Sequence, residues 1–204
     1  MLLKFFGESI NSKYIAQIVT TLKAGGVIII PTDTVYAFAG DIYSNKAIER
    51  IALLKNIKPS KANFSFLCHD LRNISEFTKP FSSEIFRLMK NSLPGPFTFI
   101  LNANSNVPAM FKSNKKTIGI RVPDNAIALS IIEALGNPLV VASVHSDDEI
   151  EDYKTDPKDI DEHLGEQVDF VIDGGPGKLD PSTVIDCTGE NPIVIREGRR
   201  KLED

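Results

Sequence analysis

The stretch that most constrains the fold runs from Gly25 to Gly40. Val27–Ile30 is a run of four β-branched residues bounded by two glycines and by Pro31, which is typical of a buried strand. The polar residues Thr32-Asp33-Thr34 follow directly. Because ligands of open α/β sheets usually bind outside the carboxyl ends of strands, we expect a central strand that delivers polar groups to a site. The structural alternative is an ordinary buried strand ending in a loop.

Length and composition predict one α/β domain over residues 1–204. Hydrophobic residues make up 42% of the chain and charged residues 25%, which is typical of a globular protein. Apolar runs such as Val27–Ile30 are far shorter than the roughly 20 residues that span a bilayer, and the N-terminus lacks a signal-peptide pattern. Cys68 and Cys187 have no metal-ligand spacing and are expected to be small core residues. We therefore expect a cytoplasmic protein without a membrane association.

The net charge of −4 is unevenly distributed along the chain. Acidic residues concentrate in 147–152 and 156–166, and we expect the loop 146–154 to be mobile and consider it as a lid. The basic residues form three groups: Lys55/Lys58/Lys61, Lys112/Lys115/Lys116/Arg121 and Arg196/Arg199/Arg200/Lys201. If these groups converge, they predict a cationic cavity that suits a small anion better than a long polyanion.

Hydrophobic periodicity and capping residues predict alternating helices and strands. Helices are expected at 11–24, ended by Gly25; at 45–55, capped by Asn45; near 70–77 and 82–92; from Asp124 or Asn125 to Leu135, ended by Gly136; and from Asp156-Pro157 onward. Strands are expected at 27–30, 63–69, 97–101, 117–123, 138–143, 168–172, 183–187 and 193–195.

Several predicted strands end in hydroxyl groups or cations. The residues concerned are Thr32/Asp33/Thr34, Thr117/Arg121, Ser143, Ser182/Thr183 and Arg196. Each one alone is more often structural, but such a set is what phosphoryl chemistry needs, since Arg, Lys and well-placed donors stabilise the charge on phosphoryl oxygens. Gly174–Lys178 lacks the spacing of a Walker loop and is expected to be a plain loop, and the three histidines lack metal-ligand spacing, so no metal site is expected.

Seven motifs occur in the same order as in a known family. They are Pro31–Tyr36, Lys55–Lys61, Pro94–Thr98, Gly119–Pro123, Pro138–Ser143, Pro181–Asp186 and Arg196–Gly198. From about Lys23 to Gly198 the chain resembles the YrdC/YciO family of threonylcarbamoyl-AMP synthases. Asn63–Cys68 and Phe86–Asn91 are most similar to the YciO branch.

The resemblance implies a twisted mixed β-sheet with flanking helices and a large concave cleft, as in dihydroxybutanone phosphate synthase. The implied reaction converts L-threonine, bicarbonate and ATP, with Mg²⁺, into threonylcarbamoyl-AMP and pyrophosphate. The product would pass to partner proteins that complete the t6A modification of adenosine 37 in tRNA.

The resemblance also implies roles for individual residues. By position, Thr32, Thr34, Arg121, Ser143 and Ser182 would hold threonine or carbamate; Lys55, Lys58, Lys61, Thr117, His145 and Arg196 would line the nucleotide; and Lys55, Arg121 and Ser143 would be catalytic.

Two departures fall on the nucleotide side. The Lys-x-Arg of the family is Lys55-Asn56-Ile57 here, so a guanidinium is lost unless Lys58 reaches the site, and lysine lacks the bidentate fork. The Ser-x-Asn of the family is Ser143-Val144-His145, which replaces an amide by an imidazole. His145 either takes part in nucleotide binding or only fills the position of the amide.

Three functions remain open at this point. The first is a threonylcarbamoyl-AMP synthase or a YciO-type variant of it. The second is a protein that binds a nucleotide, tRNA or double-stranded RNA in a cationic concavity without turnover. The third is a different adenylating or phosphate-ester enzyme on the same scaffold.

Overall fold

A computed structural model describes residues 1–5, 11–59, 62, 64–111, 116–144 and 155–202. Ten strands of this part of the chain form one mixed sheet in the order β1-β8-β2-β3-β7-β4-β6-β5-β9-β10. The pairs β1/β8, β2/β8, β4/β6 and β5/β9 are parallel, and the other five pairs are antiparallel. The expected mixed sheet of an α/β protein is therefore confirmed.

The elements alternate along the chain much as their sequence patterns predict. The strands are β1 (Leu2–Lys4), β2 (Ile28–Ile30), β3 (Ala37–Asp41), β4 (Ser65–Leu67), β5 (Phe97–Asn102), β6 (Thr117–Arg121), β7 (Leu139–Ser143), β8 (Phe170–Asp173), β9 (Thr183–Asp186) and β10 (Ile193–Arg196). The helices are α1 (Ser12–Lys23), α2 (Asn45–Leu54), α3 (Leu71–Phe77), α4 (Ser83–Ser92), α5 (Ala126–Leu135) and α6 (Pro157–Leu164), with a 3₁₀ turn at Ala109–Phe111.

Strand β2 is buried on both faces of the sheet. Val27 and Ile29 belong to one core cluster, whereas Ile28 and Ile30 belong to the other. A strand covered on both faces needs an unbroken apolar run in place of alternation, which accounts for the four β-branched residues. The expectation of a central strand is wrong, however, because β2 is third from one edge and the middle of the sheet lies between β7 and β4.

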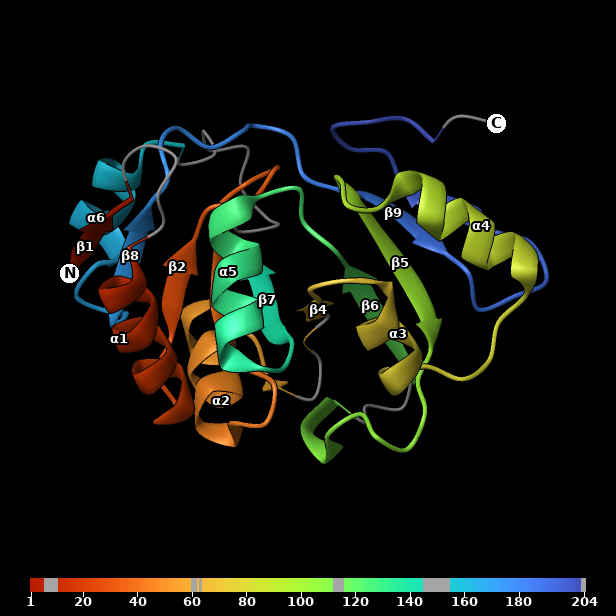
Figure 1. Ribbon diagram of the computed structural model, residues 1–204, viewed down its shortest axis with the longest axis horizontal. Helices are drawn as coiled ribbons and strands as arrows, with labels where there is room; N and C mark the ends of the chain where they lie inside the picture. The colour runs from red at the N-terminus through yellow and green to blue at the C-terminus, as the bar shows by residue number, and fades with distance from the viewer. Residues whose placement is uncertain (6–10, 60–61, 63, 112–115, 145–154, 203–204) are drawn as a thin grey trace.

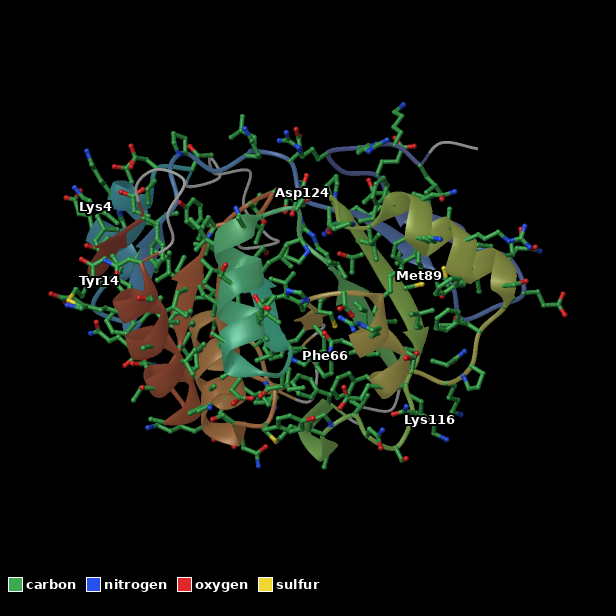
Figure 2. The ribbon with its side chains drawn as sticks, viewed as in Figure 1. Lys4, Tyr14, Phe66, Met89, Lys116 and Asp124 are labelled. Carbon is green, nitrogen blue, oxygen red and sulfur yellow. The ribbon has the colours of Figure 1, made fainter. Side chains whose placement is uncertain are left out.

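The helices divide between the two faces of the sheet. Buried residues of α1 and α5 enter the smaller core cluster with β2, β3 and β8, and Figure 1 shows these two helices side by side in front of the sheet. Buried residues of α2, α3, α4 and α6 enter the larger cluster, which includes Phe66 and Met89, labelled in Figure 2. Phe66 makes edge-to-face contacts there with Phe77 and Phe111. Helices therefore cover one face along most of the sheet, whereas on the other face α1 and α5 cover only the half from β1 to β4.

Helix ends follow local capping rules. After α1, Gly25 has a φ of +81°, its N–H donates to Leu22 O, and the N–H of Gly26 donates to Thr21 O, which is a Schellman motif. Ser44, not the expected Asn45, caps α2, because its Oγ accepts from the N–H of Ala47 at 3.2 Å. The other expected caps are confirmed: Asn125 and Gly136 bound α5, and Asp156 precedes Pro157 at the start of α6.

Two strands lack a sequence signal. β1 has three residues at the N-terminus, and β3 (Ala37–Asp41) consists largely of Ala and Gly, which are poor strand formers. β3 pairs antiparallel with β2, with Ile30 opposite Ala37. The polar segment Thr32–Thr34 is therefore the loop of a β-hairpin that turns back along the sheet.

Candidate active site

The hydroxyl groups of Thr32 and Thr34 form a directed chain of hydrogen bonds. Thr32 Oγ1 donates its only proton to the carbonyl oxygen of Val35 at 2.8 Å and accepts from the N–H of Thr34 at 3.0 Å. The 3.1 Å contact between the two Oγ1 atoms must therefore be a donation from Thr34 to Thr32. Thr32 thus uses its proton and both lone pairs inside the hairpin, while Thr34 keeps acceptor capacity for other groups.

Arg121, at the end of β6, is the cation of this site. Its Nη1 donates to Thr34 Oγ1 at 2.8 Å, and its Nη2 donates to Asp33 Oδ1 at 2.6 Å. The side chains of Arg121 and Asp33 are only 9% and 11% exposed. Within the described chain, Arg121 Nε and Asp33 Oδ2 have no hydrogen-bond partner. Buried polar atoms without a partner are uncommon in folded proteins, which marks this ion pair as a candidate functional feature.

Burial lowers the pKa of Arg121, while the neighbouring Asp33 raises it and the positive charge of Arg196 lowers it. Arginine nevertheless keeps its charge at physiological pH, since its ordinary pKa exceeds 12. The guanidinium is therefore a buried cation that is offset by one carboxylate and lies within the field of a second arginine.

The twist of the sheet explains how the β2–β3 loop reaches Arg121. Four steps separate β2 from β6 in the strand order, and each step rotates the next strand by about 20–25°, so β6 crosses β2 at roughly 80–100°. The carboxyl end of β6 can therefore point toward the hairpin loop.

Ser182 directly precedes β9, and Arg196 ends β10, on the side of the sheet beyond β6. Phe99 pairs with Ile120, so Thr98 lies opposite Arg121. Thr98 Oγ1 is hydrogen-bonded to Ser182 Oγ at 2.8 Å, and Arg196 Nη2 donates to the carbonyl oxygen of Ser182 at 3.0 Å. Sheet register thus brings these predicted residues toward the Arg121 side of the site.

Lys55 and Ser143 form a separate contact. Lys55 Nζ donates to the carbonyl oxygen of Ser143 at 3.0 Å, so a residue predicted on the nucleotide side meets one predicted on the threonine side. Asn56 has a φ of +52°, and the N–H of Ile57 donates to Ala52 O, so Ile57 completes a Schellman motif after α2. An apolar residue is common at that position of the motif. The end of α2 therefore accounts for an isoleucine at residue 57, where the family has an arginine.

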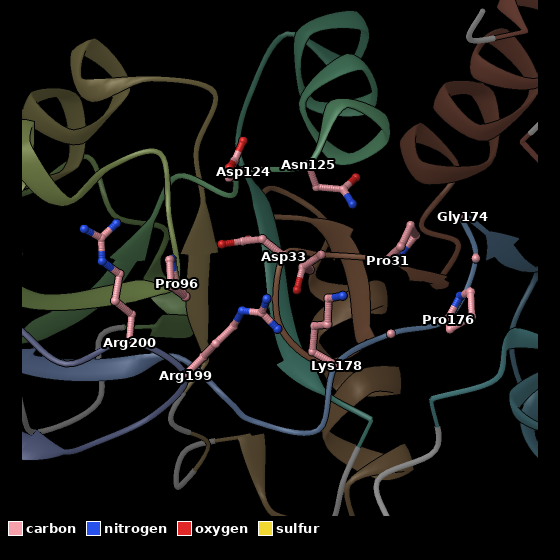
Figure 3. A pocket seen from close by; sticks show the side chains of 13 residues that line it. Pro31, Asp33, Pro96, Asp124, Asn125, Gly174, Pro176, Lys178, Arg199 and Arg200 are labelled. Atoms are coloured by element: carbon pink, nitrogen blue, oxygen red, sulfur yellow. The ribbon is translucent and has the colours of Figure 1, made fainter. Parts of the chain in front are cut away.

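A cavity of about 560 Å³ opens beside the hairpin loop. Its lining residues are Pro31, Thr32, Asp33, Pro96, Asp124, Asn125, Gly174–Lys178, Arg199 and Arg200. In Figure 3 the side chain of Asp33 lies between Lys178 and Arg199 on one side and Asp124 and Asn125 on the other. The cavity therefore presents charges of both signs, with cations at one side.

The Gly174–Lys178 loop was not among the residues predicted for the site. It is a loop, as expected, but it lines the cavity because β8 lies parallel to β2 and both strands end at the same edge of the sheet. The N–H of Lys178 donates to the carbonyl oxygen of Thr34 at 3.0 Å, and the hydroxyl of Tyr36 donates to the carbonyl oxygen of Gly175 at 2.7 Å. Its position after a parallel strand was the signal that could have identified it.

Other predicted residues lie away from this cavity or outside the described residues. Thr117 is at the opposite end of β6 from Arg121, and Lys58 is exposed after α2. Lys61, His145 and the acidic loop expected as a lid lie outside the described residues, as do Lys112 and Lys115.

Burial raises the pKa of one tyrosine and of both cysteines in the core. Burial raises the pKa of Tyr36 to about 12, so its hydroxyl remains a donor at physiological pH. Cys68 and Cys187 are buried, burial raises both thiol pKa values, and the expectation that they are core residues is confirmed. Among the described residues no group of three His, Cys, Asp or Glu could hold a metal ion, and no helix there is long and apolar enough to cross a membrane.

Known proteins are similar to this chain in sequence and in fold. Escherichia coli YciO, described as uncharacterized, is 41% identical over 190 residues, which cover 92% of this chain and 90% of that protein. The crystal structure of E. coli YciO matches with a TM-score of 0.89 over 97% of this chain and 95% of the other.

Threonylcarbamoyl-AMP synthases are more distant relatives. The Bacillus subtilis enzyme is 28% identical over 196 residues, and the match covers 93% of this chain but 55% of the enzyme. The structure of Pyrococcus abyssi Sua5 complexed with L-threonine has a TM-score of 0.86 at 24% identity, covering 97% of this chain and 57% of the other, and shows the same fold.

A family model described as Sua5_yciO_yrdC, telomere recombination, matches residues 20–198. This match covers most of the chain and agrees with the seven ordered motifs. The chain therefore belongs to the Sua5/YciO/YrdC family.

Proposed function

We propose that this protein is an ATP-dependent enzyme that makes threonylcarbamoyl-AMP from L-threonine and bicarbonate, or a YciO-type variant of that enzyme. The observation that carries the proposal is the buried Arg121, bonded to Thr34 and Asp33 beside a cavity with cations on one side. Its relatives include proteins named threonylcarbamoyl-AMP synthase, which supports the same reaction class.

The amino acid would bind at Arg121 and Thr34. Arg121 Nε is buried and has no hydrogen-bond partner among the described residues, and Thr34 retains an acceptor lone pair for a hydroxyl or N–H of the ligand. Charge-assisted donation from a buried arginine is among the strongest hydrogen bonds in proteins. The carbamate of threonine, formed with bicarbonate, would be oriented there.

The nucleotide would lie toward Lys55 and Arg196. A carbamate oxygen attacks the α-phosphorus of ATP, the bond to the β-phosphate bridging oxygen breaks, and pyrophosphate leaves. Positioning and cationic stabilisation contribute most of such a rate enhancement. Mg²⁺, when bound to the triphosphate, would offset its charge, and the exposed cavity carboxylate Asp124 could contribute to holding it. The product would then be passed to proteins of tRNA modification.

The deciding experiment measures pyrophosphate release with ATP and Mg²⁺. Release should require both L-threonine and bicarbonate and should fall at least about a hundredfold in Arg121→Lys, which keeps the charge but loses the fork. Circular dichroism of the variant verifies that the fold is retained. No release with any amino acid would overturn the proposal.

RNA or nucleotide binding without turnover is the second candidate. The exposed side chains of Lys178 and Arg199 on the cavity favour it, since they are accessible to phosphate groups. RNA retained by such contacts should dissociate steeply as salt rises, because binding releases counterions. Salt-independent retention, or none near physiological salt, would argue against this function.

A further inference from the structure

Two cations of the cavity beside the hairpin loop lie outside the seven ordered motifs. Lys178 and Arg199 line this cavity, both side chains are exposed, and within the described chain neither side chain forms a hydrogen bond or an ion pair. Figure 3 shows both side chains on the side of Asp33 that is opposite Asp124. The two cations are therefore available to a ligand that enters the cavity.

Backbone hydrogen bonds hold both residues at the cavity. The N–H of Lys178 donates to the carbonyl oxygen of Thr34 at 3.0 Å, and the N–H of Arg199 donates to the carbonyl oxygen of Pro181 at 2.8 Å. A ligand therefore has to order two side chains but no backbone segment, which lowers the entropic cost of binding.

The other charges of the lining leave the cavity positive. Asp33 is compensated by Arg121, which it contacts at 2.6 Å. Arg200 also lines the cavity, so three cations of the lining face one further carboxylate, that of Asp124. The excess of two positive charges complements a dianion better than a monoanion.

The first turn of α5 adds to this field. Asn125 lines the cavity and is the N-cap of α5, a helix of ten residues whose positive dipole end lies at that point. A Cβ on Gly174 would lie 2.9 Å from Ile127 Cδ1, so the loop that carries Lys178 packs against the same turn. The helix end and the two side chains therefore act on one cavity.

From this arrangement we infer that Lys178 and Arg199 form a binding subsite for a small phosphoryl dianion, either free phosphate or the monoester of a small molecule. The subsite goes beyond the proposed function, in which other residues hold the amino acid and the triphosphate of ATP. Phosphoryl oxygens can accept from the ammonium of Lys178 and, two at a time, from the guanidinium fork of Arg199. A volume of about 560 Å³ accommodates such a molecule, whereas an RNA duplex is too large to enter it.

The test measures binding by calorimetry at pH 8 and constant ionic strength, without ATP or threonine. Inorganic phosphate, mostly a dianion at this pH, should bind at least about tenfold more tightly than sodium acetate, a monoanion. The double variant Lys178→Met/Arg199→Gln should lower phosphate affinity at least about tenfold, and Asp124→Asn should raise it about threefold. Equal affinity for the two anions, or unchanged phosphate affinity in the double variant, would overturn the inference.

Lys201→Gln is the matched control for Arg199→Gln. Lys201 follows on the same C-terminal segment, is 81% exposed and forms an ion pair with Glu197 at 3.7 Å, but it does not line the cavity. Its substitution removes the same charge and should change phosphate affinity less than about twofold, because solvent and salt screen an exposed charge outside the cavity. An effect as large as that of Arg199→Gln would show that only net charge matters and would reject the subsite.

Two further results would also reject it. Loss of phosphate binding in Arg196→Ala, with full binding in the double variant, would place the phosphate at the triphosphate side. Retention of tRNA that depends on Lys178 and Arg199, without binding of inorganic phosphate, would assign both cations to an RNA backbone. Because the binding assay contains no substrate of the proposed reaction, its outcome is distinguishable from a failure of threonine-dependent pyrophosphate release.

Discussion

Arg121 Nη1 donates to Thr34 Oγ1 at 2.8 Å although the two residues are 87 positions apart in the chain. Thr34→Val keeps the shape of the side chain but leaves a buried guanidinium N–H without its acceptor. We expect this change to lower the free energy of unfolding by about 1–3 kcal/mol and to weaken threonine binding. Urea unfolding and calorimetry would measure both. Thr34→Ser retains the hydroxyl and is the control; equal stability of the two variants would contradict the role given to this hydrogen bond.

Lys55 and Arg196 are expected to bind the phosphates of ATP. Lys55→Ala and Arg196→Ala should each reduce ATP affinity about tenfold, equivalent to about 1.4 kcal/mol, without unfolding the chain. Lys46→Ala is the control, because Lys46 is an exposed cation on α2, the helix that ends just before Lys55. Calorimetry with ATP and Mg²⁺ checks the prediction, which fails if both variants bind ATP as the control does.

Gly198 fixes the backbone next to Ser182. A Cβ at residue 198 would overlap the carbonyl oxygen of Pro181 and lie 2.5 Å from the carbonyl carbon of Ser182. Gly198→Ala should therefore displace Ser182, cost about 1–3 kcal/mol of stability and raise the KM for threonine. At Gly189 no atom lies within 4 Å of such a Cβ, so Gly189→Ala should behave as the wild type in thermal unfolding and in kinetics.

Tyr36 makes stability depend on pH in alkaline solution. Its pKa is raised from 10.0 to about 12 in the folded protein, mainly by burial. The unfolded chain loses this proton from about pH 10, so stability should decline between pH 10 and pH 12, by up to roughly 1.4 kcal/mol per pH unit. Tyr36→Phe should show a shallower decline in urea unfolding at these pH values. Parallel curves for the two proteins would exclude Tyr36 as the cause.

Much of the fold is encoded in local patterns. The spacing of Ile18 and Leu22, the caps of α5 and α6, and the apolar run of β2 each predict the element that forms. The place of β2 in the sheet could not be predicted, because strand order is determined by long-range pairing that a single strand does not specify. β3 was missed because Ala and Gly give no strand signal even where they are fully buried.

The candidate site was predictable in part. The ordered motifs identified Thr34, Arg121, Ser182 and Lys55, whose contacts the structure describes. The roles of Asp33 and of the Gly174–Lys178 loop depend on three-dimensional proximity. Asp33 pairs with Arg121, 88 positions later, and the loop lies near the hairpin because β8, which precedes the loop, pairs parallel with β2. No local sequence rule reports such contacts.

The pairing of β2 with β8 has a consequence for synthesis on the ribosome. Ile29 pairs with Val171, and the N–H of Val27 donates to Asp169 Oδ2, 142 positions later. During translation the hairpin that carries Thr32–Thr34 therefore emerges long before its neighbouring strand exists. The apolar run Val27–Ile30 therefore stays without its β8 partner while some 142 further residues are synthesised, and an unpaired apolar strand is prone to associate with other chains during that time.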